Sequence, residues 1–177
     1  MLKVGFGYDS HRFGKNRKLI LGGIEIPAGF GLKGYSDADV LTHALIDALL
    51  GALGSGDIGT HFPDDDPKYK NISSLKLLKK VVLKVKNKGY LINNCDLQIV
   101  AESPKLQPHR EKIVNSLADN LKIDKDKINF KATTNEKMGF VGREEGMAAF
   151  AVVSIIEKKL WDFYNSIEGG EQAYDVS

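Results

Sequence analysis

The sequence predicts an α/β (α+β) fold: a single domain in which helices cover one face of a mixed β-sheet. Segments typical of strands and segments with helical spacing alternate loosely along the chain, which indicates one sheet layer under one helical layer. The 177 residues are enough for one domain with an ordinary core, and no repeat or low-complexity block divides them. The other face of the sheet needs a cover, which copies of the chain can supply. We therefore expect an oligomer.

The chain is expected to begin in β structure. Residues 2–11, LKVGFGYDSH, alternate well enough for a strand. Residues 17–27 contain two β-rich runs that Gly22 and Gly23 join and Pro27 closes, which is the pattern of a hairpin or a bulge.

The first helix is expected over residues 36–54. Ser36 is the expected N-cap, acids follow in the first turn, apolar residues recur at helical spacing, and Gly54 ends the run. The stretch from 54 to 72 has glycines, two prolines and a run of acids, and it predicts a loop of unusual length. Such loops often carry function.

The second half of the chain alternates between helices and strands again. A basic amphipathic helix is expected to begin at Ser73 or Ser74 and to end at Gly89. The elements expected after it are a strand over 92–102, a helix from Pro108 to 121, a strand over 127–135, and a buried strand over 146–160 for which a helix is the alternative.

The last residues show no periodicity from Trp161 onward. We therefore divide the chain into a domain over 1–160 and a C-terminal tail over 161–177, expected as a helical turn followed by disorder.

The composition excludes several classes of protein. The 25 Lys and Arg nearly balance the 23 Asp and Glu, so no nucleic-acid or membrane partner is expected. The N-terminus lacks the pattern of a signal peptide, and no segment is apolar enough to span a bilayer. A single cysteine, Cys95, excludes an intrachain disulfide and fits a reducing compartment. A cytoplasmic protein is expected.

Two histidines and an aspartate form the sharpest chemical pattern. Asp9 and His11 stand two apart, so a strand turns both side chains to one face. His43 lies on the first helix, four residues after Asp39 and four before Asp47. The strand pair and His43 make a ligand set for Zn²⁺ with an open fourth position, and the helical acids are candidates to orient the imidazole. The alternative is that each histidine is a hydrogen-bonded structural residue.

Other titratable residues carry weaker signals. His61, in the acidic loop, and His109, at a helix start, are expected to be surface residues. Asp64, Asp65 and Asp66 suit a hard cation as well as they suit a solvated turn.

Residues 131–146, KATTNEKMGFVGREEG, pass from a strand into a loop rich in hydroxyl, glycine and charged residues. Hydroxyls and exposed backbone amides suit phosphate oxygens, and a carboxylate beside them suits Mg²⁺ bound to a diphosphate. The alternative is a polar turn. No P-loop or dinucleotide fingerprint occurs, so an ordinary NTPase or Rossmann enzyme is disfavoured. The residues concerned are Thr133, Thr134, Glu136, Gly139, Gly142 and Arg143.

Five blocks of the sequence together resemble the 2-C-methyl-D-erythritol 2,4-cyclodiphosphate synthase family, in the same order and with the same spacing. The blocks are GYDSHRF, LILGGIEIP, SDADVLTHALIDALLGALGSGDIGTHFPDDDP, AESPKLQPH and KATTNEKMGFVGREEG. The resemblance runs from about Val4 to about Lys158, so it covers the whole expected domain and is far more specific than the Asp-x-His pair.

The resemblance implies a lyase of the non-mevalonate isoprenoid pathway. Such an enzyme converts 4-diphosphocytidyl-2-C-methyl-D-erythritol 2-phosphate into the 2,4-cyclodiphosphate and releases CMP. It also implies a homotrimer whose sheets line a central three-fold axis, with active sites between neighbouring subunits and an isoprenoid ligand in the trimer channel.

The resemblance also implies roles for individual residues. Asp9, His11 and His43 fall on the ligands of zinc or another transition metal, and Glu136 falls on the acid that holds Mg²⁺ or Mn²⁺ with the substrate diphosphate. Thr134, Tyr35 and Lys105 fall on catalytic positions. The substrate-binding positions are Ser36, Asp57, Ile58, Gly59, Phe62, Pro63, Asp64, Asp65, Asp66, Ala101, Pro104, Lys105, Gln107, Ala132, Thr133, Thr134, Phe140 and Arg143.

The sequence departs from the family pattern at three positions. Tyr35 stands where the family commonly has histidine, and its hydroxyl donates a hydrogen bond but carries no positive charge at neutral pH. Gln107 replaces a more usual apolar residue. Phe150 stands where some relatives carry an acid that faces the channel, which bears on the isoprenoid ligand.

Three other functions compete with the synthase. A metal-dependent phosphohydrolase would use water as the attacking group and form no cyclic product. A non-catalytic, metal-stabilised trimer that binds a nucleotide or isoprenoid is mildly favoured by Tyr35 and disfavoured by the complete set of Asp9, His11, His43 and Glu136. A part split from a cytidylyltransferase fusion is disfavoured because no such domain precedes Met1.

Overall fold

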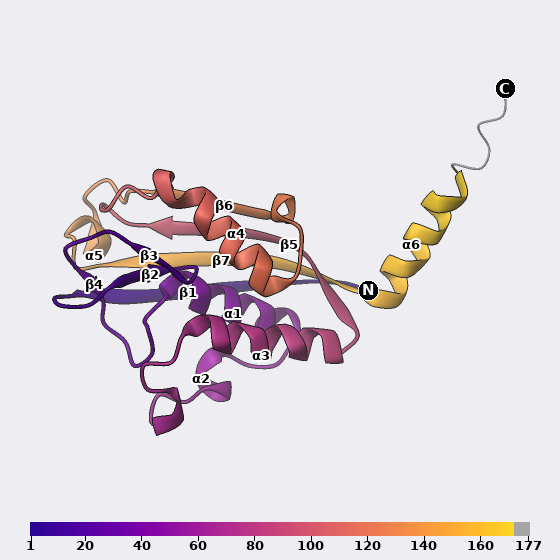
Figure 1. Ribbon diagram of the computed structural model, residues 1–177, viewed down its shortest axis with the longest axis horizontal. Coiled ribbons are helices and arrows are strands. Elements are labelled where there is room, and N and C mark those ends of the chain that lie inside the picture. Colours follow the sequence, from indigo (N-terminus) through magenta and orange to yellow (C-terminus); the bar gives the residue numbers. More distant parts are fainter. Residues whose placement is uncertain (172–177) are drawn as a thin grey trace.

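A five-stranded mixed sheet forms the centre of the computed structural model, which describes residues 1–171 (Figure 1). The strand order is β4-β1-β7-β5-β6, and every neighbouring pair is antiparallel except β5 and β6. This confirms the predicted mixed sheet. The strands are β1 (Leu2–Gly14), β4 (Gly31–Leu32), β5 (Tyr90–Val100), β6 (Ile128–Thr133) and β7 (Gly146–Glu157).

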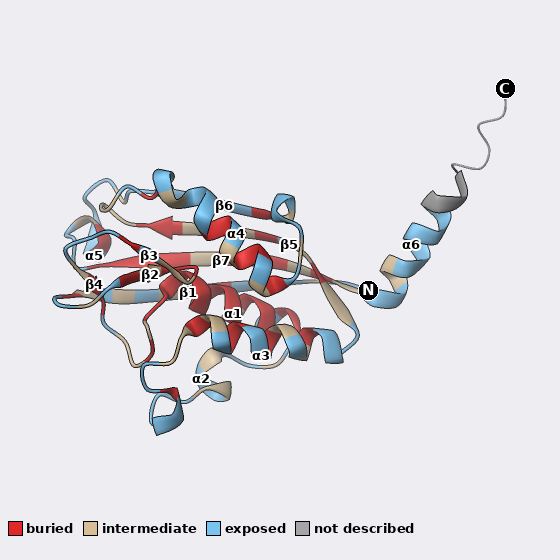
Figure 2. Ribbon diagram, in the orientation of Figure 1, coloured by how far each residue is buried: buried red, intermediate tan, exposed pale blue. Residues whose placement is uncertain are grey.

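The helices α1 (Val40–Ala52), α3 (Ser74–Asn87) and α4 (Arg110–Leu121) lie together on one face of the sheet (Figure 1). The hairpin of β2 (Leu19–Leu21) and β3 (Ile24–Ile26), which the Gly22-Gly23 pair predicted, is present beside them. The core between the two layers is made of buried aliphatic side chains. Figure 2 shows buried residues along nearly all of α1 and on the strands of the sheet.

Two glycines bring α1 directly onto β1. A Cβ atom at Gly5 would lie 1.9 Å from the carbonyl oxygen of Ala48, and one at Gly7 would lie 1.9 Å from that of Ala44. Only glycine permits such an approach of strand and helix backbones. The same alternation turns Asp9, two residues beyond Gly7, toward the beginning of α1.

Within residues 1–171, no helix covers the opposite face of the sheet (Figure 1). Val4, Phe6 and Tyr8 of β1 are 63%, 62% and 44% exposed, and Val152 of β7 is 43% exposed beside them. Tyr8 and Phe150 stack with ring centroids 5.1 Å apart. We call Val4, Phe6, Tyr8, Phe150 and Val152 the outer apolar face. The prediction that helices cover one face only is confirmed.

The first helix begins later than predicted. Asp39, not Ser36, is the N-cap of α1, because its Oδ1 accepts a hydrogen bond from the Thr42 amide at 3.0 Å. Both residue types are good caps, and the left-handed backbone at Ala38, with φ of 58°, selects the later position. The side chain of Ser36 is therefore free for another use.

The predicted long loop contains two short helical segments. They are α2 (Ile58–His61), capped by Asp57, and the 3-10 helix η1 (Pro67–Tyr69), capped by Asp66. Each aspartate accepts a hydrogen bond from a backbone N–H at the start of its segment. The composition of the stretch is that of an ordinary loop, so it did not indicate these short helices. Further short segments are the 3-10 helices η2 (Gln107–His109) and η3 (Lys125–Lys127) and helix α5 (Gly139–Gly142).

The end of the chain differs most from the prediction. Strand β7 ends at Glu157, and helix α6 (Lys158–Glu171) follows it and points away from the sheet (Figure 1). The predicted strand to 160 and the single helical turn are therefore wrong, and the predicted disorder over 172–177 lies outside the described residues. Leu160, Phe163, Tyr164 and Ile167 have helical spacing, which was the missed signal.

Within residues 1–171, no helix combines the length and the apolar character needed to cross a bilayer.

Candidate metal centre and active site

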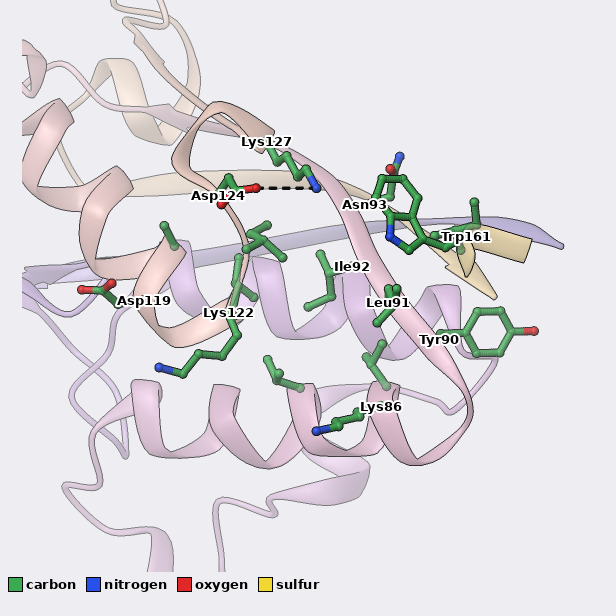
Figure 3. Close-up of a pocket in the computed structure, with 16 residues that line it drawn as sticks. Lys86, Tyr90, Leu91, Ile92, Asn93, Asp119, Lys122, Asp124, Lys127 and Trp161 are labelled. Carbon is green, nitrogen blue, oxygen red and sulfur yellow. Dashed lines mark ion pairs between the residues drawn. The ribbon is translucent and has the colours of Figure 1, made fainter. Parts of the chain in front are cut away.

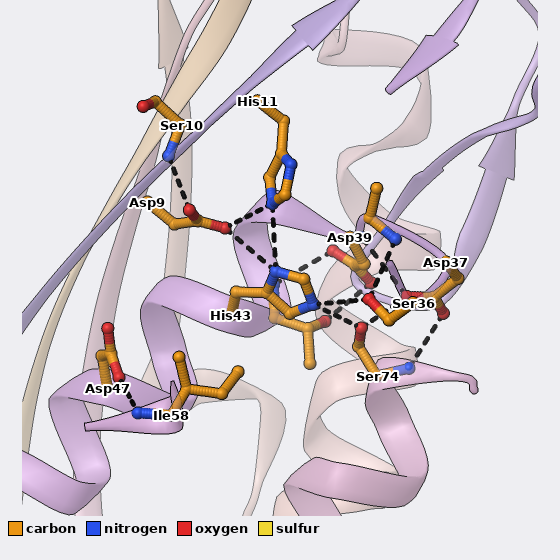
Figure 4. Close-up of polar contacts among 12 residues, drawn as sticks. Asp9, Ser10, His11, Ser36, Asp37, Asp39, His43, Asp47, Ile58 and Ser74 are labelled. Carbon is orange, nitrogen blue, oxygen red and sulfur yellow. Dashed lines mark hydrogen bonds and ion pairs between the residues drawn. The ribbon is translucent and has the colours of Figure 1, made fainter. Parts of the chain in front are cut away.

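Three predicted metal ligands meet at the junction of β1 and α1 (Figure 4). Asp9 Oδ2 lies 2.9 Å from His11 Nε2 and 3.0 Å from His43 Nδ1, and the two ring nitrogens are 3.2 Å apart. These residues are the candidate metal group found among those described. The strand supplies two donors and the helix supplies the third, as the spacing predicted.

The three atoms Asp9 Oδ2, His11 Nε2 and His43 Nδ1 form a triangle, called the donor triangle below. Its size fits a small transition metal ion. Tetrahedral zinc, with bonds of about 2.0–2.1 Å to nitrogen and oxygen, sets its ligands about 3.3 Å apart. The three observed distances are slightly shorter than this, so a small outward movement of the side chains accommodates an ion on the solvent side of the triangle. Three protein donors leave one coordination position open for an oxygen of a ligand.

Each imidazole is oriented by a group on its far side. His11 Nδ1 lies 2.6 Å from the carbonyl oxygen of Lys33, so an N–H there donates and leaves Nε2 to bind the metal. His43 Nε2 lies 2.8 Å from Ser74 Oγ and 3.1 Å from Ser36 Oγ. Ser74 Oγ donates in turn to Asp37.

The two acids predicted to orient His43 do something else. Asp39 accepts from the amides of Gly22 and Gly23 at 3.0 and 2.7 Å, so it fastens the hairpin to α1. Asp47 accepts from the amide of Ile58 at 2.7 Å. Asp39 and Asp47 each lie one helical turn from His43, and their carboxylates accept hydrogen bonds from nearby backbone amides instead.

The electrostatics of the triangle favour a bound cation. Burial raises the pKa of Asp9, but hydrogen bonds and charge from His11 and His43 outweigh it and lower the pKa well below its ordinary value. Burial lowers the pKa of His11, whereas the hydrogen bond to Asp9 and its charge raise it, with a net increase. Asp9 is thus an anion at neutral pH, ready to bind a metal.

Hydrogen bonds fix the first part of the acidic loop, residues 54–72, whereas the run from Pro63 to Asp65 is exposed. The amide of Ile58 bonds to Asp47, and the imidazole Nε2 of His61 lies 2.7 Å from the carbonyl oxygen of Ser55. His61, predicted to be a surface residue, is half-buried and bonded to this carbonyl. Asp66 pairs with Lys68 and caps η1, which favours the solvated turn over a cation site for the three acids. Of the predicted substrate-binding residues in this loop, those exposed to solvent are Asp57, Gly59, Pro63, Asp64 and Asp65.

A pocket of about 260 Å³ lies between β6 and the segment after β5. Lys105 and Thr134, two of the predicted catalytic residues, line it together. The predicted substrate-binding residues that share this lining are Ala101, Pro104, Gln107, Ala132 and Thr133.

The loop after β6 presents the remaining predicted residues. Thr134 Oγ1 donates to Glu136 Oε1 at 2.7 Å, and both side chains are exposed. Phe140 lies on α5, and Arg143, which caps that helix, pairs with Glu145 at 2.7 Å. Tyr35 is half-buried against the core, and its neighbour Ser36 contacts His43.

A larger pocket, of about 610 Å³, lies at the far end of the helical layer (Figure 3). It is bounded by α3, β5, α4 and the first turn of α6, with Lys86, Lys122 and Trp161 at its rim, and no predicted site residue lines it. Both helices end there, and lysines at helix C-termini satisfy the partial negative charge of the last carbonyls. Among the described residues, the donor triangle combines metal-type ligands with converging hydroxyls, so it is the candidate active site.

Sequence reasoning missed the residues that support the ligands. Ser74 was read only as a helix cap, and Asp37 only as an acid of the first turn. His43 and Ser74 are 31 residues apart in the chain, and Ser74 and Asp37 are 37 apart. No local sequence pattern therefore reveals these contacts. The carbonyl oxygen of Lys33 belongs to the backbone, so the residue type at this position does not indicate its contact with His11.

Comparison with known proteins places this geometry in a family. The profile of the YgbB family matches residues 2–156. A 2-C-methyl-D-erythritol 2,4-cyclodiphosphate synthase of Halothermothrix orenii is 55% identical over 161 residues, which cover 91% of this chain and 98% of that protein.

Solved structures agree with the sequence comparison. The bifunctional IspDF from Campylobacter jejuni is similar with a TM-score of 0.85 at 46% identity, covering 88% of this chain and 42% of that longer one. A 2C-methyl-D-erythritol-2,4-cyclodiphosphate synthase in a CDP-bound form is similar with a TM-score of 0.81 at 36% identity, covering 87% of this chain and 100% of that one. With this match in sequence and fold, the protein belongs to the YgbB family, among whose members its curated relatives are 2-C-methyl-D-erythritol 2,4-cyclodiphosphate synthases.

Proposed function

We propose that this protein converts 4-diphosphocytidyl-2-C-methyl-D-erythritol 2-phosphate into 2-C-methyl-D-erythritol 2,4-cyclodiphosphate and CMP. The observation that carries the proposal is the donor triangle of Asp9, His11 and His43 in a chain that is 55% identical to a synthase with this name. The reaction belongs to the non-mevalonate route to isoprenoids.

The proposed chemistry needs no nucleophile from the protein. An oxygen of the substrate's own 2-phosphate attacks the β-phosphorus, a new P–O bond forms, and the bond from that phosphorus to the CMP oxygen breaks. The protein has to bring these atoms into line and neutralise their charge. Zinc, or another divalent transition metal at the triangle, supplies Lewis-acid stabilisation of phosphate oxygen.

The residues around the second pocket suit the leaving side of the substrate. Lys105 supplies a positive charge, and the Thr134 hydroxyl lies in the same lining. Glu136, already in contact with Thr134, is placed to hold Mg²⁺ or Mn²⁺ that arrives with the diphosphate. The backbone and side chains of Ala101, Pro104, Gln107, Ala132 and Thr133 then form the cytidine side of the pocket.

The acidic loop suits the methylerythritol portion. Asp57 faces solvent at the start of α2, and hydrogen bonds from Thr60 lower its carboxyl pKa, so it is an anion that accepts from substrate hydroxyls. Ile58 and Gly59 follow it, and the exposed run from Pro63 to Asp65 is free to close over a bound ligand. Phe62 packs edge-on against Tyr69, with centroids 5.5 Å apart, and supports this run.

We propose a homotrimer with its active sites between subunits. The outer apolar face supports this assembly, because an isolated sheet would expose Val4, Phe6 and Tyr8 to water. Phe140 and Arg143 extend from α5, which packs at the edge of the same face beside Ala148 and Phe150. The aromatic ring of Phe150 would give a central channel an apolar wall, suited to an isoprenoid ligand.

The deciding experiment is ³¹P NMR of the protein incubated with the diphosphocytidyl substrate, Mg²⁺ and Zn²⁺, beside a chelated control. We expect signals of the cyclic diphosphate and CMP, and no reaction with chelator. Linear phosphates as products would establish a metal-dependent phosphohydrolase instead. Unchanged substrate in a protein with bound metal would favour a non-catalytic binding function.

Tyr35→His is expected to raise kcat. An imidazolium next to Ser36 would add a positive charge to the half-buried position of the tyrosine, and a hydrogen bond to a charged group is worth about 1.5–3 kcal/mol against about 1 for a neutral one. Steady-state kinetics of both proteins test this. An unchanged or lower kcat, with metal content intact, would show that the charge is not needed here.

Asp47→Ala is expected to weaken substrate binding more than turnover. The change leaves the Ile58 amide without its acceptor at a cost of about 1–3 kcal/mol, which loosens the start of the acidic loop. We expect KM to rise with little change in kcat, and Asp47→Asn, which keeps an acceptor oxygen, to restore most of the affinity. A fall in kcat alone, at constant KM, would contradict a loop-positioning role.

A further inference from the structure

The turn that carries Glu136 is built as an anion-binding nest, and an internal carboxylate fills it. Glu136 and Lys137 both have left-handed backbones, with φ of 50° and 59°. A turn whose backbone passes into the left-handed region brings its successive amides toward one point, which makes a concavity for an anion. Glu102 Oε1 sits there, accepting from the Asn135 amide at 2.9 Å and from the Lys137 amide at 3.2 Å.

The turn is held from its other side by α5. A Cβ atom at Gly142 would lie 2.0 Å from the carbonyl carbon of Lys137, so the helix packs directly on the turn backbone. The amides of Met138 and Gly142 continue the chain of bonds, to the carbonyls of Asn135 and Met138 at 2.9 Å each. Left-handed residues other than glycine cost about 1–3 kcal/mol each and persist only when their surroundings hold them.

We propose that Glu102 is a positioning residue, which locks this turn so that Glu136 and Thr134 are aimed before any ligand arrives. Thr134 and Glu136 are bonded to each other but exposed, so without an anchor their carboxylate and hydroxyl would sample many positions. Glu102 also keeps the amides of Asn135 and Lys137 occupied. A phosphate of the substrate therefore cannot bind these amides and remains available to bind the cation.

The consequence for function rests on the proposed synthase activity, in which Glu136 holds the divalent cation of the diphosphate. Loss of the anchor would leave the cation ligand present but misplaced. Substitutions of groups that orient metal ligands typically reduce metal affinity or activity about 10- to 100-fold. We expect Glu102→Ala to raise the Mg²⁺ concentration for half-maximal activity by about that factor, with kcat at saturating Mg²⁺ much less affected.

Hydrogen–deuterium exchange of the free protein tests the anchor without any substrate. Peptides that span residues 131–141 are expected to exchange slowly in the unmodified protein and faster in Glu102→Ala. Glu102→Gln keeps an acceptor oxygen but forms weaker, uncharged bonds, so its exchange should lie between the two. Asp119→Ala removes an exposed carboxylate of α4 on a different surface and should change neither exchange nor Mg²⁺ dependence.

The outcomes separate this proposal from the proposed function. Exchange that stays at the original rate in Glu102→Gln, or in a folded Glu102→Ala, would overturn the anchoring role. Faster exchange with an unaltered Mg²⁺ dependence would overturn the link from the turn to the cation. An unmodified protein that lacks synthase activity yet shows the graded exchange would overturn the function and leave the anchor standing.

Discussion

His43→Ala is expected to yield a folded protein that binds no zinc and makes no cyclic product. The substitution removes one of three protein donors and opens the triangle, because His43 Nδ1 lies within 3.2 Å of both other ligand atoms. It also frees Ser74 and Ser36 from their imidazole partner. Loss of a protein ligand removes more binding than loss of an orienting group, which alone costs about 10- to 100-fold. Metal content by atomic emission and product by ³¹P NMR measure the two effects.

His109→Ala is the matched control for this substitution. His109 is half-exposed at the end of η2, outside the donor triangle, so its replacement should keep both metal and activity. Ser74→Ala supplies a graded comparison, since it removes only the group behind His43 and should lower metal affinity without abolishing it. Full occupancy of zinc in His43→Ala would overturn the ligand assignment.

The layers of the fold could be predicted because their signals are local. Strand alternation over residues 2–11 and the Gly22-Gly23 pair indicate β1 and the hairpin, and the spacing of apolar residues indicates α1 and α3. The closeness of Asp9 and His11 follows from the two-residue period of a strand. Their meeting with His43 required one further assumption, that the first helix packs on the first strand, which Gly5 and Gly7 make possible.

The exact ends of the elements were less predictable because several residues compete for each role. Ser36 and Asp39 are both capping types, and the backbone of Ala38 between them decides in favour of Asp39. Helix α6 was missed although Leu160, Phe163, Tyr164 and Ile167 have helical spacing, because its Lys158–Leu160 start was assigned to the preceding strand. Figure 2 shows that much of this helix is exposed.

The supporting contacts of the site lie beyond sequence reasoning for a different reason. Asp47, Ser74 and Glu102 act through bonds to distant backbone or side chains, at separations of 11 to 33 residues. Residue type alone does not distinguish such a carboxylate from a solvated one. The grouping of Asp9, His11 and His43 could be predicted from the sequence, whereas the residues that hold them in place required the fold.

Phe6→Asp is expected to convert the proposed trimer into single chains of 19.5 kDa that retain metal but lose activity. Phe6 is 62% exposed at the middle of the outer apolar face, where it pairs with Val152 across the strands and lies 6.3 Å from the ring of Phe150. Burial of such a side chain contributes about 1.5–3 kcal/mol. An unpaired carboxylate buried in its place costs several kcal/mol, and the symmetry of the proposed trimer would repeat this cost in every subunit.

Light scattering after gel filtration measures the mass, and Leu83→Asp is the control. Leu83 of α3 is 56% exposed, comparable to Phe6, but it lies on the helical layer and should tolerate the charge without loss of assembly. The metal donors all belong to one chain, so zinc should stay bound to the separated subunits. Activity lost together with assembly, while zinc is retained, would mean that a neighbouring subunit completes the site; an unaltered mass for Phe6→Asp would show that the outer apolar face is not the interface.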